Sequence, residues 1–329
     1  MYKTNKAFIE LKNSIILNKN IIINLIKIII AAGLLSYIIF KINFNDVISS
    51  VETADKYLIL IAFLLVFLNL SLQYIKWHLT IAAILKVNDK KKTFYSLFYG
   101  IAAGSFTPLR LGEYFGRAIV FKDKSIIDVT VATFIDKLFL LITVLFFGSI
   151  SSVLFLQFHY EVNIYLTLSL LAVLFSLFGI LIILLLNPKA WNNILFDKFR
   201  FHRKLNRWLQ KLYVLKRLDR KYIGKMMVIS FLDHFCYIIQ FAILAIAFSK
   251  NFYFLKFIWV TNIIMFIKTI IPSISLGDLG IREGVSVFFF SKMGSTAAIG
   301  FNASIFLFLI NLIFPSLIGL FLLTKKNNV

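Results

Sequence analysis

The residues TPLRLGEYFGR at 107–117 return in altered form as PSISLGDLGIR at 272–282. Each stretch contains a proline, and later Leu-Gly, an acidic residue, three further residues and an arginine. The acidic residues, Glu113 and Asp278, lie 165 positions apart, which is half of the 329-residue chain. Two of the 4 prolines and seven of the 14 glycines fall in 100–117 and 272–284. This concentration indicates an internal repeat.

Each motif is joined to an apolar segment that is too short or too interrupted to cross a bilayer, which needs ~20 residues. These segments cover 93–106 and 254–271, and the second is followed at once by Pro272. Interrupted segments at corresponding places in two halves are typical of broken helices that surround a binding site. We therefore expect re-entrant hairpins over 93–122 and 254–291. In an alternative with eight spans, both short segments cross fully and no opposed hairpins form.

The composition identifies the class of protein. The chain is 60% hydrophobic and 16% charged, with a mean hydropathy of +0.87, whereas soluble domains are roughly 45–50% apolar and about 25% charged. Its net charge of +21 comes from cations gathered between apolar runs. That pattern is typical of cytoplasmic membrane loops, and no nucleic-acid-binding motif accompanies it. Cys236 is the single cysteine, which excludes an internal disulfide.

Six apolar segments are long enough to span a membrane. They cover residues 21–42, 57–85, 126–156, 162–186, 225–249 and 296–323. With six spans, every strongly basic segment lies on one side, so both termini are predicted in the cytoplasm and the chain in the plasma (inner) membrane. Residues 199–222 predict an amphipathic helix on the cytoplasmic face, where anionic lipid would gather.

The predicted fold is thus an all-α polytopic membrane protein, with residues 1–329 forming a single membrane domain. It has about six full transmembrane helices and two re-entrant helical hairpins in an inverted repeat. Repeat 1 covers about 21–156 and repeat 2 about 162–323. Because three full spans separate the motifs, the hairpins are expected to enter from opposite faces.

The motif residues have two expected roles. Pro108 and Pro272 would each end a half-helix, and Gly112, Gly277 and Gly280 would allow the chain to turn into the next one. Irregular backbone at membrane depth is tolerated where it is buried in protein or lines a wet cavity. The N-terminus of the following half-helix attracts anions.

The charged motif residues are the predicted substrate-binding site. Arg110, Arg117 and Arg282 carry forked donors that suit phosphate, while Glu113 and Asp278 would position the arginines or a cationic headgroup. A structural alternative is that Glu113–Arg117 and Asp278–Arg282 are i,i+4 pairs that neutralise themselves. Because ionisable groups inside a membrane are expensive, a functional role is the default hypothesis.

Other ionisable residues in the apolar segments are supporting candidates. Asp136 and Lys137 are neighbours in one helix and cannot face each other, so each needs a partner elsewhere, for example in the hairpins. Asp233 and His234 could serve proton coupling or a structural contact. Lys268 suits the C-terminal end of a half-helix.

Lys76 is expected to extend to the headgroup layer. The sequence contains no Walker, GxSxG or HExxH motif. We therefore expect a transporter rather than an enzyme, with no cofactor or metal.

The paired motifs resemble the flippase-like transmembrane family typified by the membrane domain of lysylphosphatidylglycerol synthases. The resemblance lies in Pro-Leu-Arg-Leu-Gly-Glu with Arg117 and in the residues Ile-Pro-Ser through Leu-Gly-Ile-Arg-Glu at 271–283, and it covers about 93–323. Asp136-Lys137 stands where the family often has Glu-Arg. The sequence from Ser275 to Gly280 departs from the family's Pro-Gly-Gly-Leu-Gly.

The resemblance implies translocation of a phospholipid or a polyprenyl-phosphate-linked substrate. It does not imply aminoacylation, because only six residues follow Leu323 and no soluble aminoacyl-transfer domain is expected. The alternative is a non-catalytic scaffold for an envelope glycosyltransferase or lipid-modifying enzyme, which the basic helix over 199–222 would dock. Nucleic acid is not an expected partner.

Overall fold

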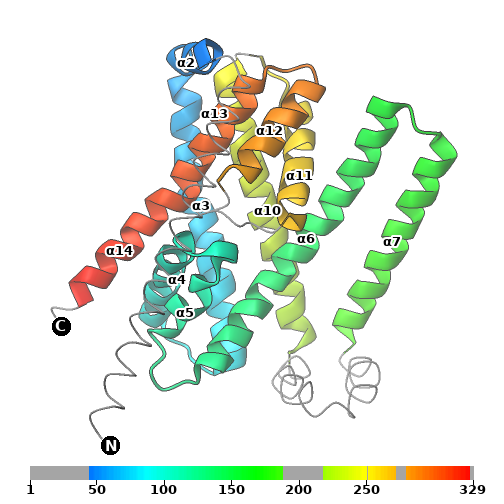
Figure 1. The fold of residues 1–329 in the computed structure, drawn as a ribbon. Helices are drawn as coiled ribbons and strands as arrows, with labels where there is room; N and C mark the ends of the chain where they lie inside the picture. The colour runs from blue at the N-terminus through cyan, green and yellow to red at the C-terminus, as the bar shows by residue number, and fades with distance from the viewer. Residues whose placement is uncertain (1–43, 188–217, 250, 272–278, 327–329) are drawn as a thin grey trace, which may run out of the picture.

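The computed structural model describes residues 44–187, 218–249, 251–271 and 279–326, and this part of the chain is helical without strands (Figure 1). The helices are α2 (Phe44–Glu52), α3 (Lys56–Thr80), η1 (Ile81–Leu85), α4 (Lys90–Ser105), η2 (Pro108–Arg110), α5 (Gly112–Ala118), α6 (Ile126–Tyr160), α7 (Ile164–Leu186), α10 (Arg220–Ser249), α11 (Phe254–Ile270), α12 (Ile281–Lys292), α13 (Ala297–Phe308), η6 (Leu309–Ile313) and α14 (Phe314–Lys326). The predicted span over 21–42, most of the predicted helix over 199–222, and Pro272, Gly277 and Asp278 lie outside the described residues.

Five described helices are long and apolar enough to span a membrane. They cover Lys56–Leu85, Ile126–Tyr160, Ile164–Leu186, Arg220–Ser249 and Ala297–Lys325, which confirms the all-α, multi-pass class predicted from hydropathy. The last span is interrupted by the π-helical turn η6 just before Pro315. Proline has no N–H to donate and its ring clashes with the carbonyl four residues earlier, which favours a wider turn at this place.

The first motif forms a helical hairpin from α4 and α5. The two arms lie close together because glycines face the partner arm: a Cβ on Gly112 would lie 2.3 Å from the Ala103 carbonyl oxygen, and one on Gly116 would lie 2.4 Å from that of Tyr99. The Lys92 Nζ lies 3.9 Å from the Asp123 Oδ1, so the chain enters and leaves the hairpin at the same end.

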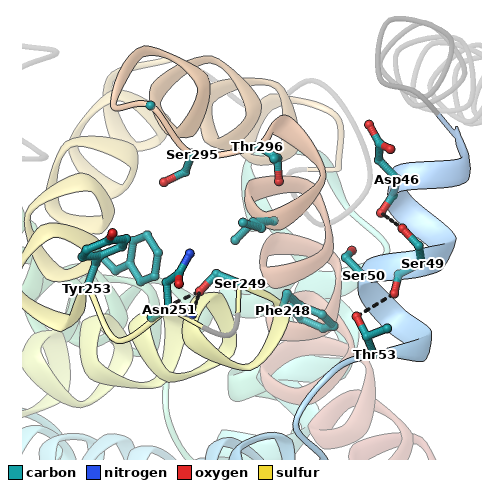
Figure 2. A pocket seen from close by; sticks show the side chains of 13 residues that line it. Asp46, Ser49, Ser50, Thr53, Phe248, Ser249, Asn251, Tyr253, Ser295 and Thr296 are labelled. Atoms are coloured by element: carbon teal, nitrogen blue, oxygen red, sulfur yellow. Dashed lines mark hydrogen bonds between the residues drawn. The ribbon is translucent and has the colours of Figure 1, made fainter.

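The second motif connects α11 to α12, which also return to their starting end. Tyr253 and Phe257 at the start of α11 share a pocket of about 460 Å³ with Ser295 and Thr296, which follow α12 (Figure 2). In Figure 1 the α4–α5 hairpin occupies the lower half of the bundle, and α11 and α12 occupy the upper half. The two helix pairs therefore lie in opposite halves of the bundle, and the re-entrant hairpins of an inverted repeat stay a prediction.

Helix α10 lies at the centre and packs against α3, α6, α11 and α13. Its buried face includes Phe241, Leu244 and Ala245, each 0% exposed. Helix α7 packs against α6 at the edge of the bundle and leaves most of its apolar side chains exposed. That distribution is expected where a helix faces lipid. The central position of α10 brings helices from both halves of the chain to one buried region.

Candidate functional site

The centre of the site is the buried carboxylate of Glu113, on the second arm of the first hairpin. Its Oε1 lies 2.7 Å from Arg117 Nη2 and its Oε2 lies 2.7 Å from Lys137 Nζ. Arg110 Nη2 is more distant, at 3.5 Å. One carboxylate therefore holds three cations, one from the hairpin tip, one from α5 and one from α6.

Arg117 connects this carboxylate to a second one. Its Nη1 lies 2.9 Å from the Asp136 Oδ2, and its guanidinium lies over the Trp77 ring, 4.3 Å from the ring centroid. Asp136 and Lys137 thus have different partners, both in the hairpin, as expected for sequence neighbours on a helix. The i,i+4 pair between Glu113 and Arg117 also forms, but as one part of a larger network.

The tip of the hairpin has an unusual backbone that sets the position of Arg110. Leu109 and Arg110 have φ values of 53° and 54°, in the left-handed region that side chains disfavour by about 1–3 kcal/mol. Thr107 holds the turn closed, because its Oγ1 accepts the Gly112 N–H at 2.6 Å and donates to the Ala103 carbonyl. Such strain persists where the surrounding structure fixes it, and often marks a functional site.

A second ion pair faces the first cluster from α3 and α10. Lys76 Nζ lies 3.2 Å from Asp233 Oδ2, and Asn69 donates to Asp233 Oδ1 at 3.1 Å. The expectation that Lys76 extends to the headgroup layer is wrong, since its side chain is 4% exposed. The signal that could have revealed it is Asp233 itself, because a carboxylate in an apolar helix needs a cation. His234 contacts Asn262 of α11 through Nε2, at 3.1 Å.

These groups line one cavity of about 180 Å³ between the first hairpin, α3, α6, α10 and α11. Its charged lining residues are Lys76, Arg110, Arg117, Lys137, Lys268, Glu113, Asp136 and Asp233. Among the described residues, five cations face three carboxylates. Lys268 has a further interaction partner, and the other four cations, Lys76, Arg110, Arg117 and Lys137, exceed the carboxylates by one positive charge with His234 neutral. Leu140, Val144 and Met265 supply apolar walls.

Two arginine atoms in this cavity have unused hydrogen-bonding capacity. The Nε of Arg110 and of Arg117, and the Oδ1 of Asp136, are buried without a partner among the described residues. A buried polar atom left unpaired costs ~1–3 kcal/mol, so such atoms normally receive water or a ligand. Arg110 is the more available, because its side chain is 33% exposed and its ion pair is long.

The structure places Arg282 apart from Arg110 and Arg117, behind Tyr237. Its Nη2 lies 2.7 Å from Glu283 Oε1 and its Nε donates to Ser304 at 2.8 Å. Arg282 also hydrogen-bonds Tyr237, which lines the cavity. Among the described residues, the three arginines that were predicted to share one phosphate pocket therefore do not all line it.

Glu283 is a site neighbour that sequence reasoning missed. Its Oε2 accepts the N–H of Gly280 at 2.7 Å, and Gly280 has a φ of 88° that favours glycine. Together they cap the start of α12. A glycine followed three residues later by glutamate was the available signal. This cap fixes the first turn of α12, on which Arg282 lies.

The larger pocket of Figure 2 has a different chemistry. It lies between α2, Asn251, Tyr253 and residues 294–296, and Asp46 is the one charged residue among its described lining residues. Several of its hydroxyls bond nearby backbone, for example Ser49 to the Asp46 carbonyl at 3.2 Å and Thr53 to the Ser49 carbonyl at 2.8 Å. The charged cavity is therefore the stronger candidate.

Comparison with known proteins places the chain by family. The sequence model of the family described as lysylphosphatidylglycerol synthase TM region matches residues 24–319, about nine-tenths of the chain. No curated protein sequence matches significantly. The matched range includes both hairpins and every charged residue of the cavity.

Proposed function

The chain belongs to the lysylphosphatidylglycerol synthase TM region family, and we propose that it translocates the phosphate-bearing headgroup of a phospholipid or polyprenyl-phosphate-linked lipid across the plasma membrane. Family membership indicates a function connected with membrane lipids. Translocation, the phosphate-bearing substrate and the plasma membrane are our proposal.

Apart from Lys268, which has a further interaction partner, the cations of the described cavity lining exceed its carboxylates by one positive charge, and this excess carries the proposal. A phosphodiester has one negative charge and a phosphate monoester about 1.5 to 2 near neutral pH. Unpaired charge away from water is costly, so an anionic headgroup would be more favourable here than a neutral or cationic one. Arginine suits phosphate because its guanidinium offers parallel donors.

The donors are not equivalent. Both Nη atoms of Arg117 already hold carboxylates, Nη2 on Glu113 and Nη1 on Asp136, so this residue is a positioning residue. Arg110 has one distant carboxylate partner and an orphaned Nε. We therefore assign the main phosphate contact to Arg110, on the strained hairpin tip.

The surroundings of the tip suit the rest of a lipid. Leu109, Leu111 and Phe115 belong to the same hairpin and are 54%, 51% and 63% exposed. In a bilayer, apolar side chains next to a polar cavity would let acyl chains stay in the hydrocarbon region while the headgroup enters the protein. This division of the lipid is what a translocase of amphiphiles requires.

The test is translocation in reconstituted vesicles. The purified chain is placed in phosphatidylcholine vesicles that contain a trace of fluorescently labelled phosphatidylglycerol. An external reductant bleaches the fluorophores that are in the outer leaflet or reach it. We expect Arg110→Gln to slow bleaching of the inner-leaflet lipid at least tenfold. Arg220→Gln is the matched control, because Arg220 is exposed and its Nε donates to the Leu186 carbonyl, outside the cavity. Equal rates for both folded variants and the parent chain would overturn the assignment.

The scaffold alternative gives a different result in the same experiment. The scaffold alternative would be favoured if the folded parent chain does not translocate lipid and is purified together with an envelope glycosyltransferase or lipid-modifying enzyme. No residue of the cavity would then need to be cationic for function. Charge-removing variants of Arg110 would in that case retain the partner.

A further inference from the structure

A second basic site lies at the end of the bundle where the first hairpin begins. It is a groove of about 380 Å³ between the start of α4, the end of the hairpin and the last turns of α14. Its charged lining residues, among those described, are Lys91, Lys92 and Lys325. It shares no described lining residue with the central cavity, so the two sites are separate.

The position of these lysines is unfavourable for the protein alone. Lys91 and Lys92 lie in the first turn of α4, the positive end of a helix, where a cation is disfavoured. The Asp89 carboxylate caps this end by accepting the backbone N–H groups of Lys91 and Lys92 at 2.9 and 3.0 Å, and among the described residues it forms no ion pair with their ammonium groups. Lys325 brings a third positive charge from α14. Among the described residues, the carboxylate that pairs with this cluster is that of Asp123, whose Oδ1 lies 3.9 Å from the Lys92 Nζ and whose side chain is 57% exposed. An ion pair of this kind contributes little to stability. The arrangement favours a bound anion.

The walls of the groove are apolar and aromatic. Tyr99 is fully buried and its hydroxyl donates to the Leu322 carbonyl at 3.3 Å, while Tyr95 is 40% exposed with its ring centroid 6.0 Å from that of Tyr99. Tyrosine rings favour the boundary between headgroups and hydrocarbon. A ligand for this groove therefore has an anionic head and an apolar body.

The groove also lies where two distant parts of the chain meet. Helix α14 packs closely on α4, and a Cβ on Gly319 would lie 2.3 Å from the Phe98 carbonyl oxygen. A ligand that contacts Lys91 on α4 and Lys325 on α14 would stabilise this junction. The first hairpin, which bears Arg110 at its tip, would then be tied to the end of the last span.

We infer that the groove binds a resident anionic glycerophospholipid. Its phosphate contacts Lys91, Lys92 and Lys325, and its acyl chains lie against Tyr95, Val120 and Leu322. A zwitterionic lipid is a poorer ligand because the lysines repel its ammonium group. This lipid is held at the junction of α4 and α14, and it is distinct from the lipid that we propose is translocated through the central cavity.

The inference is tested by native mass spectrometry of the full chain, stripped of lipid and titrated with phosphatidylglycerol or phosphatidylcholine in detergent. The groove variant is Lys91→Gln/Lys92→Gln/Lys325→Gln. The control is Lys122→Gln/Lys221→Gln/Lys225→Gln, which removes the same charge from three exposed lysines outside the groove. We expect phosphatidylglycerol to bind the control as it binds the parent chain, and the groove variant at least tenfold more weakly, equivalent to ~1.4 kcal/mol.

Three outcomes would overturn the inference. These are equal losses in the groove and control variants, equal binding of phosphatidylcholine and phosphatidylglycerol by the parent chain, and displacement of the lipid by excess inorganic phosphate. Arg110→Gln separates the two sites. Arg110→Gln should keep the bound phosphatidylglycerol that the groove variant loses. A groove that fails to bind lipid would therefore leave the proposed translocation standing, and a chain that fails to translocate lipid would leave the groove site standing. Thermal unfolding confirms that each variant is folded.

Discussion

Replacing Arg117 by methionine tests the ion network of the cavity most sharply. The Arg117 side chain is 4% exposed and its guanidinium holds both Glu113 and Asp136. After the change, Glu113 keeps Lys137 and Arg110. Asp136 has no other ion-pair partner among the described residues, and its Oδ1 is already unpaired. Removing one member of a buried ion pair costs ~3–5 kcal/mol, because the other charge stays buried. We expect Arg117→Met to lose about this much stability.

The second variant, Arg117→Met/Asp136→Leu, isolates the cause of that loss. It removes the stranded carboxylate as well, so the local net charge returns to that of the parent chain. Replacing both members of a buried pair by apolar residues is often close to neutral, and we expect most of the lost stability to return. Both changes are measured as the free energy of unfolding in detergent micelles, by denaturant titration. A single variant that loses less than ~1 kcal/mol, or a double variant as unstable as the single one, would show that Arg117 does not compensate the Asp136 charge.

Two further predictions concern packing and the second ion pair. Gly319→Ala should cost ~1–3 kcal/mol of stability by overpacking, because its Cβ would lie 2.3 Å from the Phe98 carbonyl oxygen. Gly179→Ala has open space around it and should be neutral or stabilising by up to ~1 kcal/mol. Thermal unfolding of both variants checks this, and equal shifts of their melting temperatures would contradict it. Lys76→Met should cost ~3–5 kcal/mol by leaving Asp233 buried without an ion-pair partner. Adding Asp233→Leu should restore most of this stability, and a double variant as unstable as the single one in the denaturant titration would count against the pair.

The sequence predicted those features of the fold that depend only on residues close together in the chain. Apolar length predicted the five described spans, including Lys56–Leu85, because a bilayer sets a minimum length. Helix geometry predicted that Asp136 and Lys137 have different partners. These inferences needed no knowledge of which helices are neighbours.

The remaining features depend on tertiary packing. Lys76 meets Asp233 across 157 positions, and this follows from how α3 and α10 pack, which hydropathy does not encode. Arg282 lies behind Tyr237 because of where α12 begins relative to the cavity, and the motif alone could not show that. Its pairing with Glu283 also depends on the local turn at Gly280. Arg117 and Arg282 stand at corresponding positions of the two motifs, but Arg117 pairs with Glu113 and Asp136, whereas Arg282 pairs with Glu283 and Ser304.

In the proposed function, the positive excess of the cavity selects a phosphate-bearing headgroup. Vesicles containing the parent chain, Gln73→Glu or Gln73→Met are used to compare the translocation rate of fluorescent phosphatidylglycerol with that of uncharged fluorescent glucosylceramide, as a ratio of the two. Gln73 lines the cavity and its Nε2 donates to Asn69 Oδ1. Both variants lose this hydrogen bond, but only Gln73→Glu adds a negative charge. At ~6 Å from a phosphate charge, in an effective dielectric of about 20, that charge opposes phosphate binding by ~3 kcal/mol. We predict a ratio above one for the parent chain and Gln73→Met, and at least a tenfold lower ratio for Gln73→Glu. The same ratio for all three proteins would contradict the account.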